Sequence, residues 1–330
     1  MAGAQGIEVV GVSSGYDGAR VLHAVSFTVP AGHITVMVGP SGAGKSTCIS
    51  HLVALRPPST GVILVEGRSL WDMGRRELNR LRRRSGVLLQ GSGVYGSALW
   101  ESMTVLDNLK LQLRTVTTLP EEEIHARALE RLEEVGLRAS AGEAPAHLSA
   151  GMRKRVAIAR ALASDPDYAI LDGFELGIDQ VRLARLCTLV RERHERLGDT
   201  MLIVTQDMDV ARRLADHVVV LIGGRVAAEG LAADVLADDR VDVRQLVTGA
   251  ASGPLQLASP ELGSPRGAPP PEPHSPFDVP LWLAAVVLLA AMTASAFALG
   301  ATSVVEAVAI VGVWVVAAGV FVARGVRARR

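Results

Sequence analysis

Residues 34–46 read Ile34-Thr35-Val36-Met37-Val38 and then Gly39-Pro40-Ser41-Gly42-Ala43-Gly44-Lys45-Ser46. The second part has the G-x-x-x-x-G-K-[ST] pattern of a phosphate-binding loop, and the apolar run before it fits the strand that such a loop follows. In this kind of loop, backbone N–H groups and the positive end of the next helix bind phosphate, while the lysine reaches the outer phosphates. We therefore predict that residues 39–47, with Thr47 as the last, hold a nucleoside triphosphate and that Ser46 binds its Mg²⁺.

The composition limits what else this chain of 330 residues is expected to bind. It has 34 Lys and Arg against 34 Asp and Glu, and this zero net charge gives no support for a nucleic-acid partner. Its two cysteines, Cys48 and Cys187, are too few for a disulfide framework or a cysteine-based zinc site. Lysine is rare among the basic residues, so a lysine inside the loop pattern argues against a chance glycine-rich turn.

The segment from about residue 7 to residue 237 alternates short apolar runs with helical segments, which is the pattern of an α/β domain. Besides the run before the loop, buried strands are predicted at residues 168–171, 201–205 and 218–222. A helix is predicted between Pro120 and Gly136, because proline favours a helix start and glycine a helix end. Asp172 ends one predicted strand and is the carboxylate expected to complete the Mg²⁺ shell with Ser46.

Further motifs follow in a fixed order along the chain. They are Tyr16, Gln90, the run Leu148-Ser149-Ala150-Gly151-Met152, and Asp179. In this order and spacing they resemble the nucleotide-binding subunits of ATP-binding cassette (ABC) transporters over about residues 7–237. The resemblance implies a P-loop NTPase of the ABC ATPase type, an α/β fold with a RecA-like core plus a helical subdomain. It also implies ATP and Mg²⁺ as cofactors.

The same resemblance implies a role for each motif. Tyr16 would stack on adenine, and Gln90 would contact Mg²⁺, the attacking water and the membrane subunit. Ser149 and Gly151 of the signature motif would reach across a head-to-tail dimer to the γ-phosphate of the partner, and Asp179 would lie at the dimer interface. The implied partners are a second ABC ATPase subunit, as a homodimer or a heterodimer, and an integral membrane permease.

Two segments resemble one branch of the family. Residues 98–105 and 152–157 are similar to the ATPases of lipid importers called maintenance-of-lipid-asymmetry and mammalian-cell-entry systems. This resemblance implies transport of phospholipid or sterol, with lipid-binding extracytoplasmic proteins as further partners. The substrate is therefore implied by resemblance and not by any residue chemistry.

The chain departs from the family pattern at the residues that would hydrolyse ATP. Gly173 stands where the family has a glutamate that orients the attacking water, and Gln206 stands where a histidine contacts the γ-phosphate. Ala150 replaces the first glycine of the signature and adds a Cβ. Glu175 follows closely, but we expect its side chain to point elsewhere. Loss of a positioned base costs about a hundredfold to ten-thousandfold in rate, so we predict retained ATP binding with weak hydrolysis at this site.

These departures leave two arrangements and one rival function open. The chain either pairs with a complete ATPase in an asymmetric dimer, which we favour, or forms a homodimer that hydrolyses ATP slowly. The rival function is that of a membrane-anchored pseudo-ATPase, which would sense nucleotide and regulate or scaffold a complex without transporting anything.

The C-terminal part predicts attachment to a membrane. We expect an ABC ATP-binding domain at 1–247, a Pro/Gly/Ser-rich linker at 248–279, a transmembrane hairpin at 280–323 and a basic cytosolic tail at 324–330. The apolar stretches 281–299 and 303–322 are each long enough to cross a bilayer, although a pair of buried core helices is the alternative. The hairpin would hold the chain in the cell (inner) membrane with the ATP-binding domain on the cytoplasmic side. Arginines between residues 75 and 84 could touch anionic lipid, but a solvated helix face is the simpler interpretation.

Overall fold

The computed structural model describes residues 6–16, 19–89 and 99–255. Gln90, most of the linker, the two apolar stretches and the basic tail lie outside these residues, so the predictions made for them stay predictions. Within the described ranges, no helix combines the length and the apolar character needed to cross a membrane.

The centre of the fold is a six-stranded sheet with the order β10-β9-β3-β8-β7-β6. Its strands are β3 (Ile34–Val38), β6 (Ser85–Leu88), β7 (Tyr168–Asp172), β8 (Thr200–Thr205), β9 (His217–Ile222) and β10 (Arg225–Leu231). All pairs except β9 with β10 are parallel. Every residue of β3, β7 and β8 is buried, as expected for parallel strands that are covered on both faces. The predicted strands in this sheet are confirmed.

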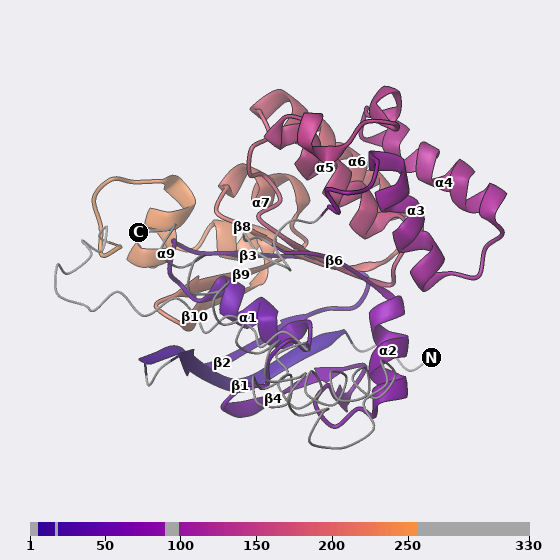
Figure 1. The fold of residues 1–330 in the computed structure, drawn as a ribbon. Helices are drawn as coiled ribbons and strands as arrows, with labels where there is room; N and C mark the ends of the chain where they lie inside the picture. Colours follow the sequence, from indigo (N-terminus) through magenta and orange to yellow (C-terminus); the bar gives the residue numbers. More distant parts are fainter. Residues whose placement is uncertain (1–5, 17–18, 90–98, 256–330) are drawn as a thin grey trace, which may run out of the picture. The chain divides into compact units, whose positions relative to one another are not determined.

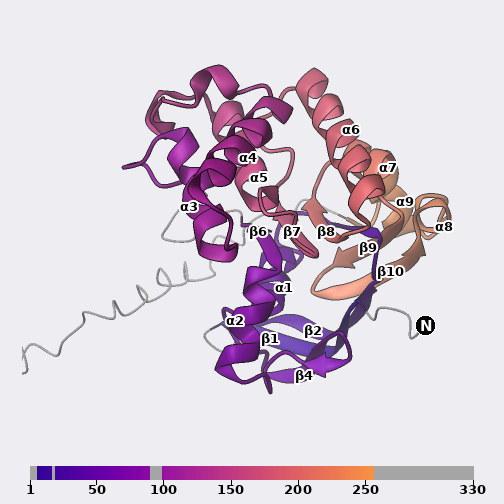
Figure 2. The ribbon, with the colours of Figure 1, turned by 90° about the vertical axis from the view of Figure 1, so that its right-hand side faces the viewer.

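A second, antiparallel sheet covers one side of the molecule. It has the order β2-β1-β4-β5 and consists of β1 (Ile7–Tyr16), β2 (Ala19–Val29), β4 (Thr60–Val65) and β5 (Arg68–Ser69). The helix α1 (Lys45–Leu52) lies between the two sheets (Figures 1 and 2), and its Cys48 and Ile49 pack in one apolar cluster with Val9 and Phe27 of the antiparallel sheet. The strand that precedes the phosphate-binding loop and the helix that follows it are therefore fixed from both sides.

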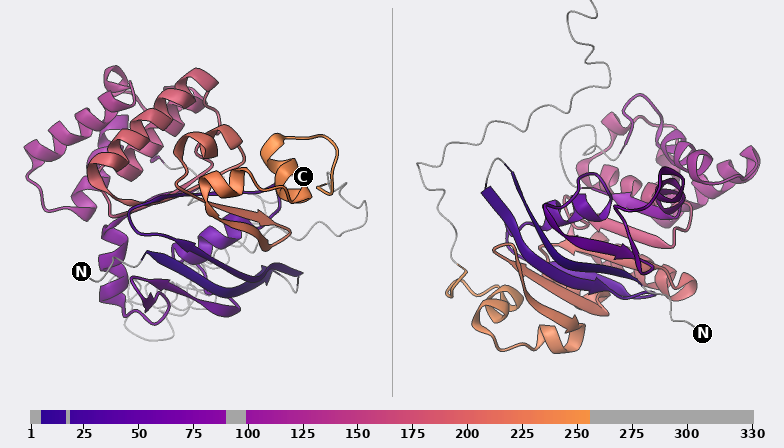
Figure 3. Two further views of the ribbon diagram at one scale, coloured as in Figure 1. Left: turned by 180° about the vertical axis from the view of Figure 1, so that it is seen from behind. Right: turned by 90° about the horizontal axis from the view of Figure 1, so that it is seen from below.

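Helices cover the opposite face of the six-stranded sheet, as Figures 1 and 3 show. This side contains α3 (Val105–Val116), α4 (Glu121–Glu134), the short 3₁₀ helices η1 (Arg138–Ser140) and η2 (Pro145–His147), α5 (Ala150–Leu162), α6 (Gln180–Leu197) and α7 (Met208–Leu214). The remaining helices are α2 (Arg75–Arg83), α8 (Ala232–Leu236) and α9 (Val241–Thr248). The helix predicted between Pro120 and Gly136 is confirmed as α4, with Ile124 and Leu132 buried on its inner face.

The arginine-rich segment is largely solvent-facing. The helix α2 has no buried residue, and its arginines are exposed. Arg84, which follows the helix, is half-buried and pairs with Glu66 at 2.7 Å and with Asp167 at 2.5 Å. The simpler interpretation of a solvated helix face fits this arrangement.

Candidate nucleotide-binding site

The phosphate-binding loop connects β3 to α1 at the carboxyl edge of the six-stranded sheet. The strand ends at Val38 and the helix begins at Lys45, which is the strand-to-helix context that the sequence pattern requires. A Cβ at Gly39 would lie 2.1 Å from the carbonyl oxygen of Leu221 on β9, so a larger residue cannot fit there. The loop is thus held against the neighbouring strand by backbone contact.

The ammonium group of Lys45 lies inside this loop. Its Nζ donates hydrogen bonds to the carbonyl oxygens of Gly39 at 2.7 Å and Pro40 at 2.9 Å. Burial lowers the pKa of Lys45, while the carboxylates of Asp172 and Glu175 act in the opposite direction. A cation that is buried among backbone carbonyls and near two carboxylates is positioned to neutralise a polyphosphate.

Ser46 and Asp172 bring a hydroxyl and a carboxylate together. Asp172 ends β7 and is 3% exposed, and its Oδ2 lies 3.5 Å from Oγ of Ser46, which donates to it. Two hard oxygen donors at the loop suit Mg²⁺, which usually binds one or two carboxylates or hydroxyls together with phosphate and water. The described residues contain no group of three or more His, Cys, Asp or Glu that could form a closed metal cage, and Mg²⁺ on a nucleotide needs none.

The segment after Asp172 has an unusual backbone. Gly173 has φ of +63°, a left-handed conformation that residues with a Cβ rarely adopt, and its N–H donates to the carbonyl of Val204 at 3.0 Å. The next side chain, Phe174, is completely buried in the core beneath the helices. Replacement of the expected glutamate by glycine therefore comes with a local backbone that a glutamate would not favour.

The expectation that Glu175 points elsewhere is wrong. Its Oε1 accepts a hydrogen bond of 3.1 Å from the backbone N–H of Gln206, directly after β8. Because β8 lies between β3 and β7 in the sheet, this amide sits between the loop and Asp172. The left-handed backbone at Gly173 turns the chain so that Glu175 reaches the amide of Gln206. Residue spacing in the sequence does not reveal this turn.

Gln206 enters the site through its backbone. Its side chain is exposed, whereas its N–H supplies the contact to Glu175. The residue after it, Asp207, caps α7 by accepting a hydrogen bond from the N–H of Asp209 at 2.7 Å. The resemblance implies that the residue at position 206 contacts the γ-phosphate through its side chain. Position 206 lies at the carboxyl edge of the parallel strands, the same edge as the phosphate-binding loop.

Lys154 on α5 lies near the carboxylates of Asp172 and Glu175, which the motifs do not predict. Its ammonium group is half-buried, and burial lowers its pKa while Asp172 and Glu175 act in the opposite direction. Two of the chain's three lysines, Lys45 and Lys154, thus lie near the same two carboxylates. The scarcity of lysine was the signal that could have pointed to Lys154 from sequence.

Two of the predicted dimer residues cap helices in the single chain. The Oγ of Ser149 accepts from the N–H of Met152 at 3.3 Å at the start of α5, and Asp179 accepts from the N–H of Arg182 at 3.0 Å at the start of α6. Ser149 and Asp179 are both exposed. Their contact with a partner subunit remains a prediction, and capping leaves both residues at the surface.

The start of α5 contacts the segment after β7 directly. A Cβ at Gly151 would lie 2.5 Å from the carbonyl oxygen of Gly177, so the two backbones touch. Ala150 is exposed and is not among the described residues with positive φ, so its extra Cβ is compatible with the helix start. Leu148 is buried and anchors the signature motif to the core.

The predicted site residues fall into three groups. Lys45, Ser46, Asp172 and the backbone positions of Gly173 and Gln206 meet at the carboxyl edge of the parallel strands. The signature motif and the dimer loop lie at helix starts, as described above. Tyr16 ends β1 on the antiparallel sheet, and its predicted stacking on adenine stays a prediction, as does the role of Gln90.

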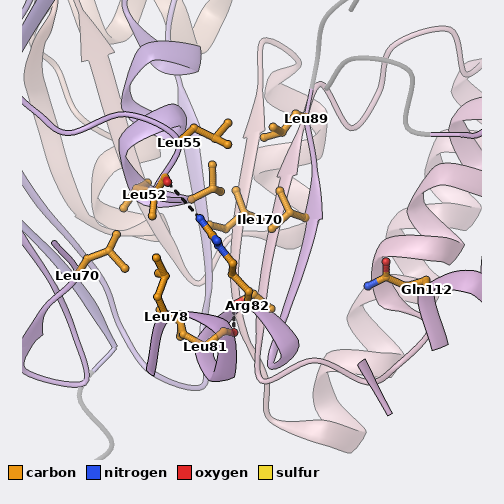
Figure 4. A pocket seen from close by; sticks show the side chains of 13 residues that line it. Leu52, Leu55, Leu70, Leu78, Leu81, Arg82, Leu89, Gln112 and Ile170 are labelled. Carbon is orange, nitrogen blue, oxygen red and sulfur yellow. Dashed lines mark hydrogen bonds between the residues drawn. The ribbon is translucent and has the colours of Figure 1, made fainter. Parts of the chain in front are cut away.

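An apolar pocket of about 280 Å³ lies at the C-terminal end of α1 (Figure 4). Leucines and one isoleucine form most of its wall: Leu52, Leu55, Leu70, Leu78, Leu81, Leu89 and Ile170. Arg82 crosses the pocket and donates a hydrogen bond of 3.4 Å to the carbonyl of Ala54, and Gln112 lines it from α3. Leu89 is the last described residue before Gln90, so the pocket adjoins the segment that would contact the membrane subunit.

Comparisons with known proteins agree with this geometry. Residues 22–174 match the family model described as ABC transporter. The chain is 34% identical over 252 residues to the probable ribonucleotide transport ATP-binding protein mkl of Mycobacterium leprae, which covers 76% of this chain and 71% of that protein. It is 36% identical over 236 residues to the intermembrane phospholipid transport system ATP-binding protein MlaF of Escherichia coli, covering 72% of this chain and 86% of that protein.

Among solved structures, the fold is similar to the dimeric ATP-binding cassette MJ0796 in a post-hydrolysis state with ADP and Pi. The TM-score is 0.63 at 29% sequence identity, over 68% of this chain and 98% of that one. The phosphate-binding loop, the carboxylate of Asp172 and these relatives together show that this chain belongs to the ATP-binding subunits of ABC transporters.

Proposed function

We propose that this chain binds Mg-ATP at a dimer interface and thereby powers or gates a lipid-importing permease, with weak hydrolysis at its own site. The observation that carries the proposal is the contrast at one edge of the sheet. Lys45 contacts the loop carbonyls and Ser46 contacts Asp172, whereas Gly173 has no side chain and a left-handed backbone. Nucleotide binding is thus supported more strongly than rapid turnover.

The loop residues are suited to hold the phosphates. The loop amides and the start of α1 would bind the phosphate oxygens, and Lys45 would exchange its carbonyl partners for the outer phosphates. Ser46 and Asp172 would hold Mg²⁺, which neutralises charge on the phosphates when it is bound. These contacts depend on none of the altered residues.

A second ATPase subunit fits the exposed signature. Ser149 and Asp179 are exposed, and the similar cassette MJ0796 is dimeric. We favour an asymmetric dimer over a slow homodimer, because a complete ATPase would supply the hydrolysis that Gly173 does not support. In that dimer this chain would lend Ser149 and Gly151 to the active site of the partner.

Lipid is the proposed substrate. The similarity to MlaF and the likeness of residues 98–105 and 152–157 to lipid-importer ATPases support it. The name of mkl mentions ribonucleotides, so overall identity alone does not select a substrate. Phospholipid or sterol, delivered by lipid-binding extracytoplasmic proteins, is the class to test first.

The apolar pocket is the proposed contact for the permease. Leu55 of the pocket is 47% exposed, and α2 lines the pocket with Leu78 and Leu81 while its arginines are exposed. An apolar segment of a membrane subunit would bury these leucines at the end of α1, next to the segment that begins with Gln90. The hairpin of residues 281–299 and 303–322 would keep the chain at the inner membrane with its ATP-binding domain in the cytoplasm.

The rival function is a membrane-anchored, nucleotide-sensing regulator or scaffold. The same altered positions, Gly173 and Gln206, favour it, because sensing needs binding without turnover. The permease distinguishes the two functions. A transport subunit co-purifies with a permease and stimulates lipid movement, whereas a regulator does not.

The test is Mg²⁺-dependent ATP turnover by the full-length protein in nanodiscs, with Lys45→Ala as the background. Turnover slightly above that background, together with saturable ATP binding, is the expected result. Turnover at the background level with ATP still bound would favour the nucleotide-gated partner of a complete ATPase. Failure of the unaltered protein to bind ATP would contradict the proposed function.

A further inference from the structure

We propose that Glu175 orients the water that attacks ATP at this site, in place of the side chain that Gly173 lacks. The inference rests on the proposed function, since it concerns the weak hydrolysis expected there. It assigns a catalytic residue at a position where neither the motifs nor the comparisons place one.

The position of the Glu175 carboxylate comes from the sheet. The strand β8 pairs with β3 on one side and with β7 on the other. The amide that follows β8, on Gln206, donates to Oε1 of Glu175 at 3.1 Å. The carboxylate is therefore held between the phosphate-binding loop and Asp172, where the outer phosphate of a bound nucleotide would lie.

The second oxygen of the same carboxylate is unused. Oε2 of Glu175 is buried and has no hydrogen-bond partner among the residues that the structure describes. A carboxylate oxygen is an acceptor only, and leaving it buried without a donor is unfavourable. A water molecule bound between this oxygen and the phosphates would satisfy it and would be placed to attack the γ-phosphorus.

Two ammonium groups lie near the carboxylates of Asp172 and Glu175. The two carboxylates of Asp172 and Glu175 act on the ammonium groups of Lys45 and Lys154, from the loop and from α5. These two cations offset the charge of the two carboxylates, so that Glu175 is compatible with a triphosphate beside it. A carboxylate that only stabilised the turn after Gly173 would not need a second oxygen without a hydrogen-bond partner.

The chemical step is ordinary hydrolysis. The water oxygen forms a bond to the γ-phosphorus while the bond from that phosphorus to the bridging oxygen of ADP breaks. Oε2 of Glu175 accepts the proton that the water loses and releases it to solvent. The products are ADP, inorganic phosphate and one proton, and the carboxylate is regenerated.

The test compares Glu175→Gln with Glu195→Gln in the full-length protein in nanodiscs. Glutamine keeps an oxygen that can accept from the Gln206 amide, so the turn is retained while the basic oxygen is lost. Glu195 is an exposed residue of α6 and serves as the matched control. Binding of a fluorescent ATP analogue and steady-state turnover are measured separately for each variant.

We expect Glu175→Gln to bind the analogue as tightly as the unaltered protein, or more tightly, because a negative charge near the phosphates is gone. Its turnover should fall to the Lys45→Ala background, because the turnover above that background is the part assigned to Glu175. Glu195→Gln should match the unaltered protein in both measurements. A thermal melt of each variant checks folding, and Glu175→Asp, which keeps the charge but shortens the reach, repeats the test if glutamine disturbs the fold.

Three results would overturn the assignment. Turnover by Glu175→Gln and Glu175→Asp equal to that of the unaltered protein is the first. A parallel loss of binding and turnover, which indicates a structural role, is the second. The third is turnover by the unaltered protein at the Lys45→Ala background, and there the intact ATP binding would still support the proposed function. Absence of ATP binding by the unaltered protein would contradict the proposed function itself.

Discussion

The two ends of the nucleotide site differ in how closely they follow their sequence pattern. At the loop after β3, every patterned residue is present, and backbone contact between Gly39 and Leu221 fixes the loop. After β7, the pattern is kept at Asp172 and Asp179 but replaced between them, and the backbone turns left-handed at Gly173. The difference teaches that the phosphate-binding pattern is kept while the segment after β7 is changed, so we predict that phosphate binding and hydrolysis are separable in this chain.

The largest effect is expected at Phe174, which joins the altered segment to the core. Because Phe174 is completely buried, Phe174→Ala should lower the free energy of unfolding by about 3–5 kcal/mol. Urea unfolding measures the change. Leu176→Ala is the control, since that side chain is 41% exposed, and equal losses for both variants would contradict the buried role of Phe174.

Substitution of Lys45 in the phosphate-binding loop should lower the affinity for ATP, whereas substitution of Lys110 should not. Lys45→Ala removes the ammonium that would bind the outer phosphates, and charge-assisted hydrogen bonds of about 1.5–3 kcal/mol correspond to a loss of ATP affinity of roughly tenfold to a hundredfold. Lys110→Ala is the matched control, because Lys110 pairs with Glu121 at 2.7 Å on the helices away from the loop. Binding titrations decide the matter, and similar losses in both variants would argue against the loop as the binding site.

The left-handed turn predicts a strain at Gly173. Gly173→Ala should cost about 1–2 kcal/mol of folding stability, because an alanine at φ of +63° is strained. Gly142→Ala is the control, since a Cβ at Gly142 would meet nothing within 4 Å. Thermal or urea unfolding measures both, and a stable Gly173→Ala would show that the turn relaxes.

The same backbone strain should limit how far substitution with the family residues raises ATP turnover. Gly173→Glu combined with Gln206→His restores the family residues, but the new glutamate must adopt the left-handed conformation or change the turn. We expect a gain in turnover well below the hundredfold that a positioned base supplies. A full gain, measured as steady-state turnover, would mean that the turn is plastic and that the altered segment has lost only side chains.

The smallest expected effect is a lack of reactivity at the two thiols, one in each region. Burial raises the pKa of Cys48 on α1 to about 12 and that of Cys187 on α6 to about 11. Both should resist a thiolate-selective reagent at pH 8 in the folded protein and react in urea. Mass spectrometry after brief labelling at increasing urea concentration reports whether the region of Cys48 or that of Cys187 opens first. Rapid labelling of Cys48 in the native state would contradict a phosphate-binding loop and α1 that are fixed by the core.

Features that depend on contiguous residues could be predicted from the sequence. The turn after Gly173, which brings Glu175 to the amide of Gln206, could not. The phosphate-binding loop, the strand β3 and the helix α4 follow from local patterns, and the structure has them at the expected residues. Glu175 was misplaced because its position depends on one backbone dihedral at Gly173 and on the packing of Phe174 in the core. Neither is visible in residue spacing. Lys154 was not assigned to the site because no local pattern shows that this position on α5 lies near Asp172 and Glu175, although β7 is the next element in the chain.

The backbone contact between Gly151 and Gly177 has a consequence for timing in a dimer. The stretch from Asp172 to Asp179 carries Glu175 at one end of its turn and Gly177, pressed against the signature helix, at the other. If the signature serine engages the nucleotide of a partner, any shift of α5 must move this stretch. The state of the nucleotide that the signature motif contacts would then reach Glu175 within a few residues, so the two sites would be coupled instead of acting independently.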